Sequence, residues 1–448
     1  MPFALTPATI DAATFRSLQE SASLLGKLSQ AMSDDIGLIK ELHSPLVRGD
    51  IFFAELLSIH EELHADQSLP RVPLLIQRSD FMLDESMGPR LVECNSIAAG
   101  MAPFGEQAHH LHQYIRQQWP AEFSRFSSAA TGQLVPNNAI ARLSEAIVAA
   151  ARAIRSEAGD EGAPTFVMVI QENEDNVFDQ YLLERALRER GVRTFRRTFR
   201  ELHAQLSSGP NERLMLKNGG AIDVVYLRAG YQYCDYIATD LDTRRCCDAL
   251  RETRIFIERH RVAVNATVAQ QLATSKRTQQ YLSEASAKTL EKYKMSASKV
   301  QSLKAILAEM RSIDTGTADF LRQEGQAANW VLKNQGEGGG HCLFDEQIVA
   351  QLELLSGDDY AAWTLMRRLR PVARKTPTVI IRNGVAERVE GLVSELGLFT
   401  AHLAGRPLLQ ADETDPAYLG YLIRSKPPTV TEGGIHSGSG VLDSLIYN

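Results

Sequence analysis

The stretch VLKNQGEGGGHCLF, residues 331–344, decides how this chain of 448 residues is interpreted. An apolar run typical of a strand leads to Lys333, and Gly336 and residues 338–340 are glycines on either side of Glu337. Because each glycine costs backbone entropy, so many in a short segment indicate that another group must approach this backbone closely. Glycines alone would also suit a purely structural turn. The neighbouring lysine and glutamate separate the two interpretations.

A glycine-rich turn beside a strand exposes backbone N–H groups that can converge on phosphate oxygens. Lys333 supplies a positive point charge for the same oxygens. Glu337 would repel phosphates unless a cation lay between them, and Mg²⁺ binds carboxylate and phosphate oxygens together. The segment is neither a Walker-type phosphate loop, which needs Gly-Lys-Ser/Thr, nor a dinucleotide fingerprint, because His341 replaces the last glycine. It predicts a magnesium–nucleotide site.

The segment LVECNSIAAG, residues 91–100, offers further oxygen ligands for the metal. Glu93 and Asn95 are two apart on a predicted strand, so both side chains face the same side. A polar strand face turned to solvent is the alternative. Cys94, between them, should point to the opposite, packed face, which argues against a catalytic cysteine.

Composition limits the class of protein. Hydrophobic content of 44% and charged content of 23% are typical of a globular chain, and the length suggests two or three packed units. A net charge of -7 argues against general nucleic-acid or anionic-membrane binding. We see no membrane span, no signal peptide and no CxxC pair among the five cysteines. We therefore expect a cytoplasmic protein with reduced thiols, although a secreted protein cut from a longer precursor would look the same.

The periodicity of apolar residues divides the chain into three parts. Helical spacing dominates up to about residue 160, with strands expected at RVPLLIQRSDFML and PRLVECNSI. Strands and helices then alternate, which predicts a small, mostly parallel sheet with helices on its faces. Helices return after about residue 272, followed by strands with a hairpin turn at Asn383-Gly384. The predicted domains are 1–163, 164–271 for substrate binding, and 272–448 with the glycine loop 334–342 and a C-terminal lid 427–441.

Eight segments, in the family's order, resemble the eukaryotic-type glutathione synthetase family of ATP-grasp ligases. They are QRSDFML, VECNSI, QENEDNVFDQ, VVYLRAGY, ATSKRTQQ, VLKNQGEGGG, VSELG and LIRSKPPTVTEGG. The resemblance implies an α/β ATP-grasp fold with an inserted parallel α/β substrate-binding domain, glycine-rich lid loops and a homodimer. It also implies an enzyme that joins γ-glutamylcysteine to glycine through an acyl phosphate, using ATP and two Mg²⁺ ions. The implied partners are these small molecules, with no nucleic acid and no membrane.

The resemblance assigns roles to individual residues. The implied metal ligands are Glu93, Asn95 and Glu337. The implied nucleotide-binding residues are Lys276 and Lys333 on the phosphates, with Gly338, Gly339, Gly340, Phe344, Met366, Glu395 and Lys426. The implied γ-glutamyl dipeptide residues are Arg78, Glu174, Asn176, Gln180, Arg228 and Tyr231. Arg424, with Ile435 and His436, is implied at the pocket for the acceptor amino acid. Lys276, Lys333 and Arg424 are the residues expected to act in catalysis.

The chain departs from the family's pattern in several places. After the strand with Glu93 and Asn95, the family usually has Ser-Ala-Ser, whereas residues 98–100 of this chain are Ala-Ala-Gly. Where the family usually has an Arg-Asp pair, this chain has Arg228-Ala229. The nucleotide hinge, usually Met-Glu, is Met366-Arg367, and the lid carries GGIHSGSG where glycine users have GGVAAG. His436 is bulkier than alanine and adds a hydrogen-bonding group. Glycine as acceptor, another acceptor or dipeptide, and a binding or effector protein with little turnover therefore all stay open.

The HHLH motif contains His109 and His112, one helical turn apart and able in principle to bind zinc. The sequence offers no third ligand. We therefore expect these histidines to lie on a solvated helix face.

Overall fold

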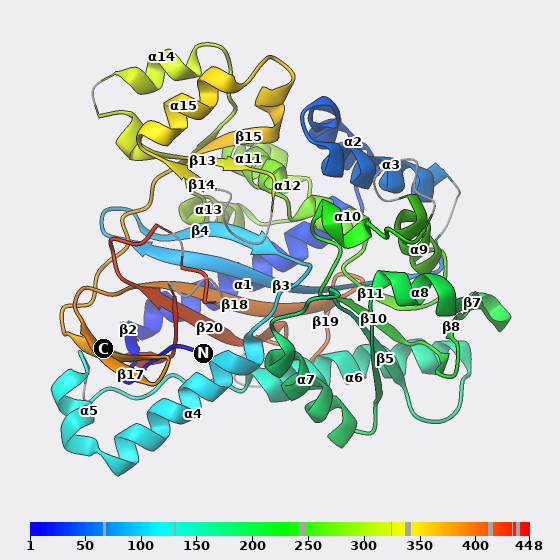
Figure 1. Ribbon diagram of the computed structural model, residues 1–448, viewed down its shortest axis with the longest axis horizontal. Coiled ribbons are helices and arrows are strands. Elements are labelled where there is room, and N and C mark those ends of the chain that lie inside the picture. The colour runs from blue at the N-terminus through cyan, green and yellow to red at the C-terminus, as the bar shows by residue number, and fades with distance from the viewer. Residues whose placement is uncertain are drawn as a thin grey trace.

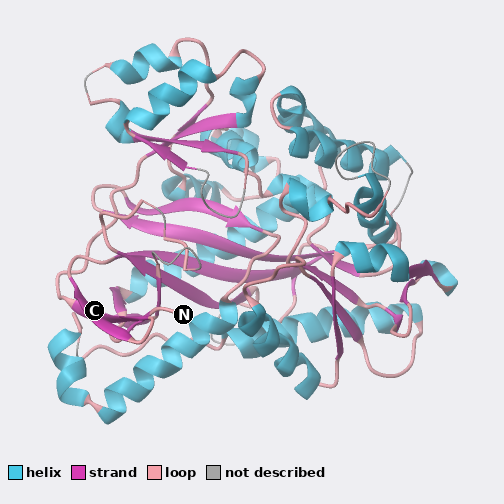
Figure 2. Cartoon of the chain, in the orientation of Figure 1, coloured by secondary structure: helices cyan, strands magenta, loops and turns pink. Residues whose placement is uncertain are grey.

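A large mixed sheet of 13 strands runs through the body of the chain (Figures 1 and 2). The computed structural model describes residues 1–65, 69–129, 131–241, 248–323, 325–336, 342–410, 415–431, 433–435 and 440–448. The sheet order is β17 (Val385–Val389), β16 (Thr378–Arg382), β1 (Phe3–Ala4), β21 (Val441–Asp443), β20 (Tyr418–Lys426), β18 (Val393–Leu403), β3 (Val72–Asp84), β11 (Ala263–Asn265), β10 (Val224–Leu227), β5 (Thr165–Val169) and β6 (Arg193–Arg197). β4 (Gly88–Asn95) pairs with β3, and β19 (Arg406–Pro407) pairs with β18.

The remaining strands form three smaller sheets. One is a separate four-stranded sheet of β12 (Met310–Arg311), β15 (Trp363–Arg367), β13 (Trp330–Asn334) and β14 (Cys342–Phe344), at the top of Figure 1. The others join β2 (Ala8–Ile10) to β22 (Leu445–Tyr447), and β7 (Leu206–Ser208) to β8 (Leu214–Leu216) and β9 (Gly220–Ala221). The four-stranded sheet has a hydrophobic core of its own, centred on Trp330, Leu332 and Leu365.

Helices cover both faces of the large sheet, and the last two helices pack against the four-stranded sheet. They are α1 (Ala12–Ser33), α2 (Ile36–His43), α3 (Ile51–Ala65), α4 (Ala102–Gln118), α5 (Pro120–Phe126), α6 (Ala139–Ala158), α7 (Val177–Glu189), α8 (Phe199–Gln205), α9 (Asp248–Glu258), α10 (Val268–Ala273), α11 (Lys276–Glu284), α12 (Ala287–Glu291), α13 (Ala297–Ile306), α14 (Thr317–Arg322) and α15 (Glu346–Leu354). On one face, Phe15 and Leu18 of α1 pack against Leu398 of β18. On the other face, Leu143 of α6 shares a core with Phe399 of β18, since neighbours along a strand point to opposite faces.

The expected alternation of strands and helices between residues 164 and 271 is confirmed, and the strands pair in parallel as predicted, but they belong to the large sheet and do not form a separate small one. β5 pairs in parallel with β6 and β10, and β10 pairs in parallel with β11. β11 also pairs in parallel with the first residues of β3, through Ala263 opposite Val72. The parallel strands therefore continue the antiparallel part of the same sheet. The domain boundaries stay a prediction.

Local residue preferences account for several turns. Gly159 ends α6 in the left-handed conformation, with φ of 70°, which glycine adopts readily at the end of a helix. Asn383-Gly384 joins β16 to β17 in a hairpin, as expected. Asn138 occupies the N-cap of α6 without a side-chain cap bond. Asn137 instead donates to the carbonyl of Tyr421, which attaches this turn to β20.

The expectation that His109 and His112 lie on a solvated helix face is wrong, because α4 packs against β20 and β21 and buries both side chains. His112 Nε2 donates to the Ala4 carbonyl at 2.8 Å, and its Nδ1 accepts from the Ser444 hydroxyl at 2.6 Å. Burial lowers the pKa of His112 to about 3 and that of His109 to about 4. Both are therefore neutral structural histidines. None of the helices that the structure describes is long and apolar enough to cross a bilayer.

Candidate active site

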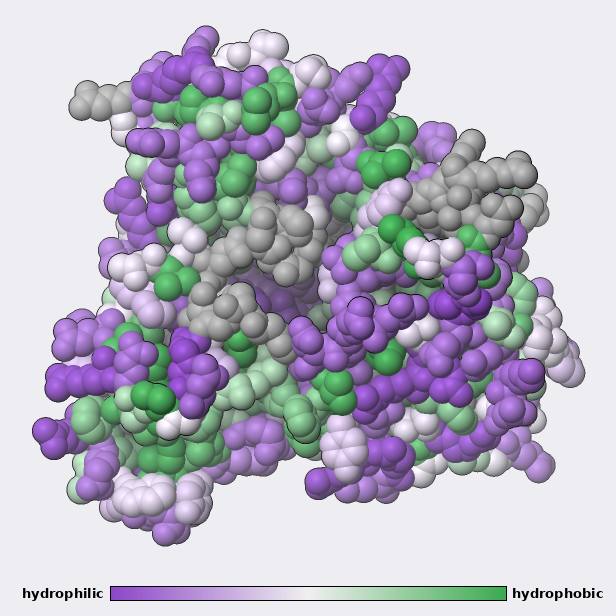
Figure 3. All heavy atoms as spheres, in the orientation of Figure 1, coloured by the Kyte–Doolittle hydropathy of each residue, from purple (hydrophilic) through white to green (hydrophobic). Residues whose placement is uncertain are grey.

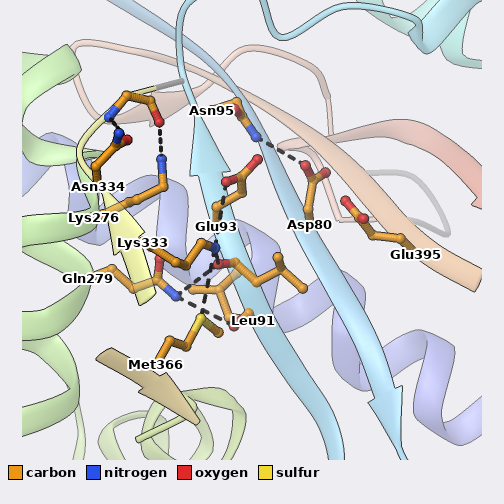
Figure 4. A network of polar contacts seen from close by, with 12 residues as sticks. Asp80, Leu91, Glu93, Asn95, Lys276, Gln279, Lys333, Asn334, Met366 and Glu395 are labelled. Atoms are coloured by element: carbon orange, nitrogen blue, oxygen red, sulfur yellow. Dashed lines mark hydrogen bonds and ion pairs between the residues drawn. The ribbon is translucent and has the colours of Figure 1, made fainter. Parts of the chain in front are cut away.

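The candidate site lies where the four-stranded sheet faces the large sheet. Figure 3 shows a hollow between these two parts of the molecule, and the side chains visible inside it are hydrophilic. Lys333, near the end of β13, extends across to β4 (Figure 4). Its Nζ donates to the Val92 carbonyl at 3.3 Å and lies 3.9 Å from a carboxylate oxygen of Glu93. A predicted phosphate ligand and a predicted metal ligand therefore meet across the two sheets.

Glu93 is held in its charged form. Burial alone would raise the pKa of the Glu93 carboxyl group. The positive charges of Lys333, Lys276, Arg78 and Arg424 outweigh burial and lower this pKa to about 2. The side chain keeps 30% of its surface exposed. Glu93 is therefore an ionised and partly exposed carboxylate, which is the form that binds a divalent cation, and two lysines balance its charge here.

Asn95 lies on the same face of β4 as Glu93, as the spacing predicted. Its amide nitrogen donates to Asp80 at 3.1 Å, so the amide oxygen is the atom left to bind a cation. A carboxylate and an amide oxygen match the ligand preference of Mg²⁺. Glu337 lies outside the described residues, and within those residues no group of three His, Cys, Asp or Glu side chains could hold a metal. Two of the three predicted ligands thus lie on one face of β4, and the ligand role of all three stays a prediction.

Lys276, the first residue of α11, meets the start of the glycine loop. Its Nζ donates to the Gly336 carbonyl, and the neighbouring Arg277 N–H donates to the Gln335 side chain at 2.9 Å. The Gly336 N–H donates to the Asn334 side chain at 2.9 Å. Two lysines from different elements therefore converge where the loop begins (Figure 4). Gly338, Gly339 and Gly340, with His341, lie outside the described residues.

Asp80 is a site residue that our sequence reasoning missed. Arg78 binds it with Nε at 2.7 Å and with a terminal nitrogen at 2.8 Å, so the pair is bidentate. Arg424 approaches the same carboxylate at 3.2 Å and also pairs with Glu395. Asp80 is fully buried beneath these groups. The available signal was the charged sequence RSD within an apolar strand, where alternate residues share a face.

The predicted dipeptide residues gather where β10 ends and α7 begins. Arg228 donates to Asp179 at 2.8 Å, and Asp179 also accepts the Met101 N–H at 3.0 Å. Glu174 accepts the Asn176 N–H at 2.9 Å, which turns the chain into α7. Asp179 is the second residue that sequence reasoning missed, although it lies directly before the predicted Gln180 in VFDQ.

Several buried polar atoms in this region have no hydrogen-bond partner among the described residues. They are Asn176 Oδ1, Asp179 Oδ1, both amide atoms of Gln180, and Arg228 Nε. Buried polar groups in proteins are almost always paired, so each of these atoms calls for a partner. These atoms include both donors and acceptors, so a single ligand that satisfied all of them would carry groups of both kinds.

The other predicted residues are more dispersed. Tyr231 accepts from the Gln171 amide at 3.1 Å, at the edge of the dipeptide region. Met366 is buried in β15, with its sulfur 3.9 Å from Lys333 Nζ. Phe344, on β14, lies under the Arg368 guanidinium at 5.3 Å.

Three predicted residues belong to the C-terminal segment. Lys426 donates to the Thr431 carbonyl. Ile435 is buried in the core beside β20, and His436 lies outside the described residues.

Comparison with known proteins identifies the family. The family described as "Eukaryotic glutathione synthase, ATP binding domain" matches residues 1–447.

The chain belongs to the eukaryotic glutathione synthase family.

Among similar family members, the chloroplastic glutathione synthetase of Solanum lycopersicum is 28% identical over 99% of this chain and 77% of its own length. The glutathione synthetase of Homo sapiens is 28% identical over 99% of this chain and 89% of its own length.

Among solved structures, a glutathione synthetase-like effector from Globodera pallida, in its apo form, is similar over the whole chain and 90% of its own, with a TM-score of 0.72 and 17% identity. At that identity the likeness concerns the fold alone, so the two proteins share the mixed α/β architecture while most of their side chains differ.

Proposed function

We propose that this chain is an ATP-dependent carbon–nitrogen ligase of the glutathione synthetase type, which joins γ-glutamylcysteine to glycine. The observation that carries the proposal is Lys333 Nζ, 3.9 Å from the ionised Glu93, with Lys276 at the start of the same glycine loop. When the triphosphate of ATP binds the two lysines, the Glu93 carboxylate needs another positive partner. Mg²⁺ can bind the carboxylate and the triphosphate at the same time. Because the chain belongs to the glutathione synthase family, we propose γ-glutamylcysteine and glycine as the two substrates that are joined.

The first step transfers a phosphoryl group. The C-terminal carboxylate of γ-glutamylcysteine attacks the γ-phosphorus of ATP, and the bond to the β-phosphate oxygen breaks. The products are ADP and the acyl phosphate of the dipeptide. Lys276 and Lys333 neutralise charge on the phosphate oxygens and fix the donor in line with the carboxylate. Positioning and electrostatics account for most catalysis in such transfers, because the protein forms no covalent bond.

The second step forms the peptide bond. The amine of glycine attacks the acyl carbon, a tetrahedral oxyanion forms, and its collapse releases inorganic phosphate and an amine proton. Arg424 is proposed to bind the carboxylate of glycine, and its pairs with Asp80 and Glu395 fix the orientation of its guanidinium. Closure of the proposed lid, residues 427–441, would protect the acyl phosphate from water.

Glu93, Asn95 and Glu337 would hold Mg²⁺, which neutralises charge on the triphosphate during transfer. The proposal includes two Mg²⁺ ions and a homodimer, which are supported by the family resemblance alone. It also includes a cytoplasmic location, which is supported by the expectation of reduced thiols.

The dipeptide residues carry the substrate half of the proposal. The unpartnered atoms of Asn176, Asp179, Gln180 and Arg228 are interleaved donors and acceptors. The α-ammonium and α-carboxylate of a γ-glutamyl group would satisfy both kinds. Glu174 supplies a carboxylate for the ammonium, and Arg228 a guanidinium for the carboxylate.

A changed acceptor or dipeptide is the second candidate. It is favoured by the sequence Ala98-Ala99-Gly100, which removes two hydroxyl groups from the dipeptide pocket, and by His436 at the predicted acceptor pocket. A pocket that loses hydrogen-bonding groups loses discrimination against analogues.

Phosphate release from ATP, measured against a panel of γ-glutamyl dipeptides and acceptor amino acids, tests both candidates. The main proposal expects the highest kcat/KM with γ-glutamylcysteine and glycine. A higher value with another pair supports the second candidate. Binding of ATP and γ-glutamylcysteine in calorimetry without phosphate release from any pair would overturn both and favour a binding protein.

A further inference from the structure

The four-stranded sheet belongs to one continuous segment, residues 310–367 (the nucleotide lobe), and both ends of this segment lie against the β3–β4 hairpin (Figure 1). Where the chain enters the lobe, Leu307 forms a parallel bridge with Leu91 of β4. Where the chain leaves the lobe, Pro371 forms an antiparallel bridge with Asp84, the last residue of β3. Two attachments to one hairpin thus join the nucleotide lobe to the large sheet.

Asp84 holds the chain at its exit from the lobe. One carboxylate oxygen accepts the Arg370 N–H at 2.6 Å. The other oxygen accepts the N–H groups of Ser86 and Met87 and the Ser86 hydroxyl, each at 2.9 Å. The Asp84 side chain is buried, and a carboxylate that accepts backbone N–H groups forms charge-assisted hydrogen bonds. Asp84 therefore binds the turn of the hairpin with one oxygen and the chain that leaves the lobe with the other.

Backbone hydrogen bonds continue this attachment on both sides of Asp84. The Glu85 N–H donates to the Arg370 carbonyl at 2.9 Å, and the Val372 N–H donates to the Leu83 carbonyl at 2.8 Å. Burial alone would raise the pKa of Asp84, but the backbone N–H groups that it accepts outweigh burial and lower this pKa. Asp84 is therefore a carboxylate at neutral pH, which makes it the charged member of the attachment.

The attached chain is packed directly against the candidate site. Leu369, between the lobe and the attachment, packs in a small core with Met366 of β15. The sulfur of Met366 lies 3.9 Å from Nζ of Lys333, which itself lies 3.9 Å from the Glu93 carboxylate. A displacement of this chain would therefore move Met366 and Lys333 relative to Glu93.

We infer that Asp84 is a positioning residue for the nucleotide, because its bond to the Arg370 N–H fixes the lobe that carries Lys333 over the strand that carries Glu93. The inference rests on the proposed function, in which the triphosphate binds between the nucleotide lobe and β4. Asp84 acts through the chain after β15 and does not take part in the chemistry. The predicted dipeptide residues lie where β10 ends and α7 begins, outside this attachment, so a weaker attachment should affect the nucleotide and spare the dipeptide.

Asp84→Asn separates the two tasks of the carboxylate in steady-state kinetics. The amide oxygen can still accept the donors of the turn, whereas the amide NH2 group would face the Arg370 N–H, so two donors would oppose each other. We expect KM for ATP to rise about fivefold or more, because residues at a hinge control how a lobe closes on its ligand. KM for γ-glutamylcysteine should stay within about twofold, because separated sites act independently.

Two further variants distinguish this role from a general loss of stability. Val372→Pro removes the neighbouring bond to the Leu83 carbonyl at a position whose side chain is exposed, and it should raise KM for ATP in the same way. Ser86→Ala is the matched control, because it removes a bond to Asp84 within the turn and leaves the Arg370 N–H bonded. Both KM values should be unchanged in Ser86→Ala. Equal rises of both KM values in Asp84→Asn would overturn the inference.

Hydrogen exchange of the protein without ligands provides a readout that does not depend on activity. The amides of residues 368–374 should exchange about tenfold faster in Asp84→Asn than in the wild type, and at the wild-type rate in Ser86→Ala. Unchanged exchange in Asp84→Asn, or an unchanged KM for ATP in that variant, would overturn the inference and leave the proposed function standing. A wild-type protein that binds no ATP would overturn the proposed function, and the inferred role of Asp84 with it.

Discussion

The side-chain nitrogen of Lys333 lies 3.9 Å from the carboxylate of Glu93, although the two residues belong to different sheets. Lys333 is on β13 of the four-stranded sheet, and Glu93 is on β4 of the large sheet. The lysine thus provides, next to Glu93, the positive charge that a metal would supply when nucleotide is bound. Lysine and metal should therefore compete for Glu93 until phosphates engage the lysine.

Replacing Lys333 with Met should separate these two roles. Without ATP, Lys333→Met should bind Mg²⁺ about fivefold or more tightly, because a neighbouring positive charge is gone. With all substrates, phosphate release should fall about 100-fold or more, because the transferred phosphate loses a charge partner. Calorimetry with Mg²⁺ alone measures the first effect. Equal Mg²⁺ affinity in wild type and variant would contradict competition, and the exposed Lys288→Met is the matched control.

Glu93→Gln should remove turnover and keep the fold. The amide is nearly isosteric, so the melting temperature should change little, whereas the loss of a charged ligand should lower kcat about 100-fold or more at saturating Mg²⁺. Glu337→Gln should behave in the same way if Glu337 completes the site. The exposed Glu387→Gln controls for the loss of one negative charge. Full activity of Glu93→Gln would show that the metal assignment is wrong.

Asp80→Asn should affect both stability and substrate binding. The variant leaves Arg78 and Arg424 without their shared carboxylate, and breaking a buried ion pair costs about 3–5 kcal/mol of unfolding free energy. KM for γ-glutamylcysteine should rise, because Arg78 loses its orientation. Urea denaturation and initial rates measure the two effects. Asp319→Asn, which removes an exposed i,i+3 pair with Arg322, should cost less than about 1 kcal/mol. A similar small loss in Asp80→Asn would mean that the Asp80 network contributes little.

The buried histidines predict how stability depends on pH. Burial lowers the pKa of His112 to about 3, well below its value in the unfolded chain. The unfolded state therefore takes up a proton below about pH 6.5 that the folded state refuses. The contribution of neutral His112 to the free energy of unfolding is fully present above about pH 6.5. It falls by about 1.4 kcal/mol per pH unit as the pH drops toward 3.

Urea denaturation of His112→Asn between pH 7 and pH 4.5 checks this. The slope of the unfolding free energy against pH should be smaller in the variant by the uptake of about one proton. His110→Asn, on the exposed side of the same helix, is the control. If His112→Asn keeps the full slope of the wild type, His112 must titrate normally in the folded state.

Features that depend on neighbouring residues were predictable from the sequence. The shared face of Glu93 and Asn95 follows from strand geometry, and the end of α6 at Gly159 follows from the left-handed conformation. The resemblance to the glutathione synthase family supplied the residues of the dipeptide region, which lie together where β10 ends and α7 begins.

Features that depend on distant pairing were missed. Asp80 gains its role because β18 lies between β3 and β20, which brings Arg424 to a carboxylate that is distant in sequence. His112 looks solvated in HHLH because only tertiary packing places Ala4 and Ser444 around its ring.

A crystal structure with Mn²⁺ and a non-hydrolysable ATP analogue would show whether metal and nucleotide meet at Glu93. We expect an anomalous peak bonded to the Glu93 carboxylate and the Asn95 amide oxygen, with Lys333 moved from Glu93 to the phosphates. Nucleotide bound elsewhere, or a metal that leaves Glu93 paired with Lys333, would contradict it.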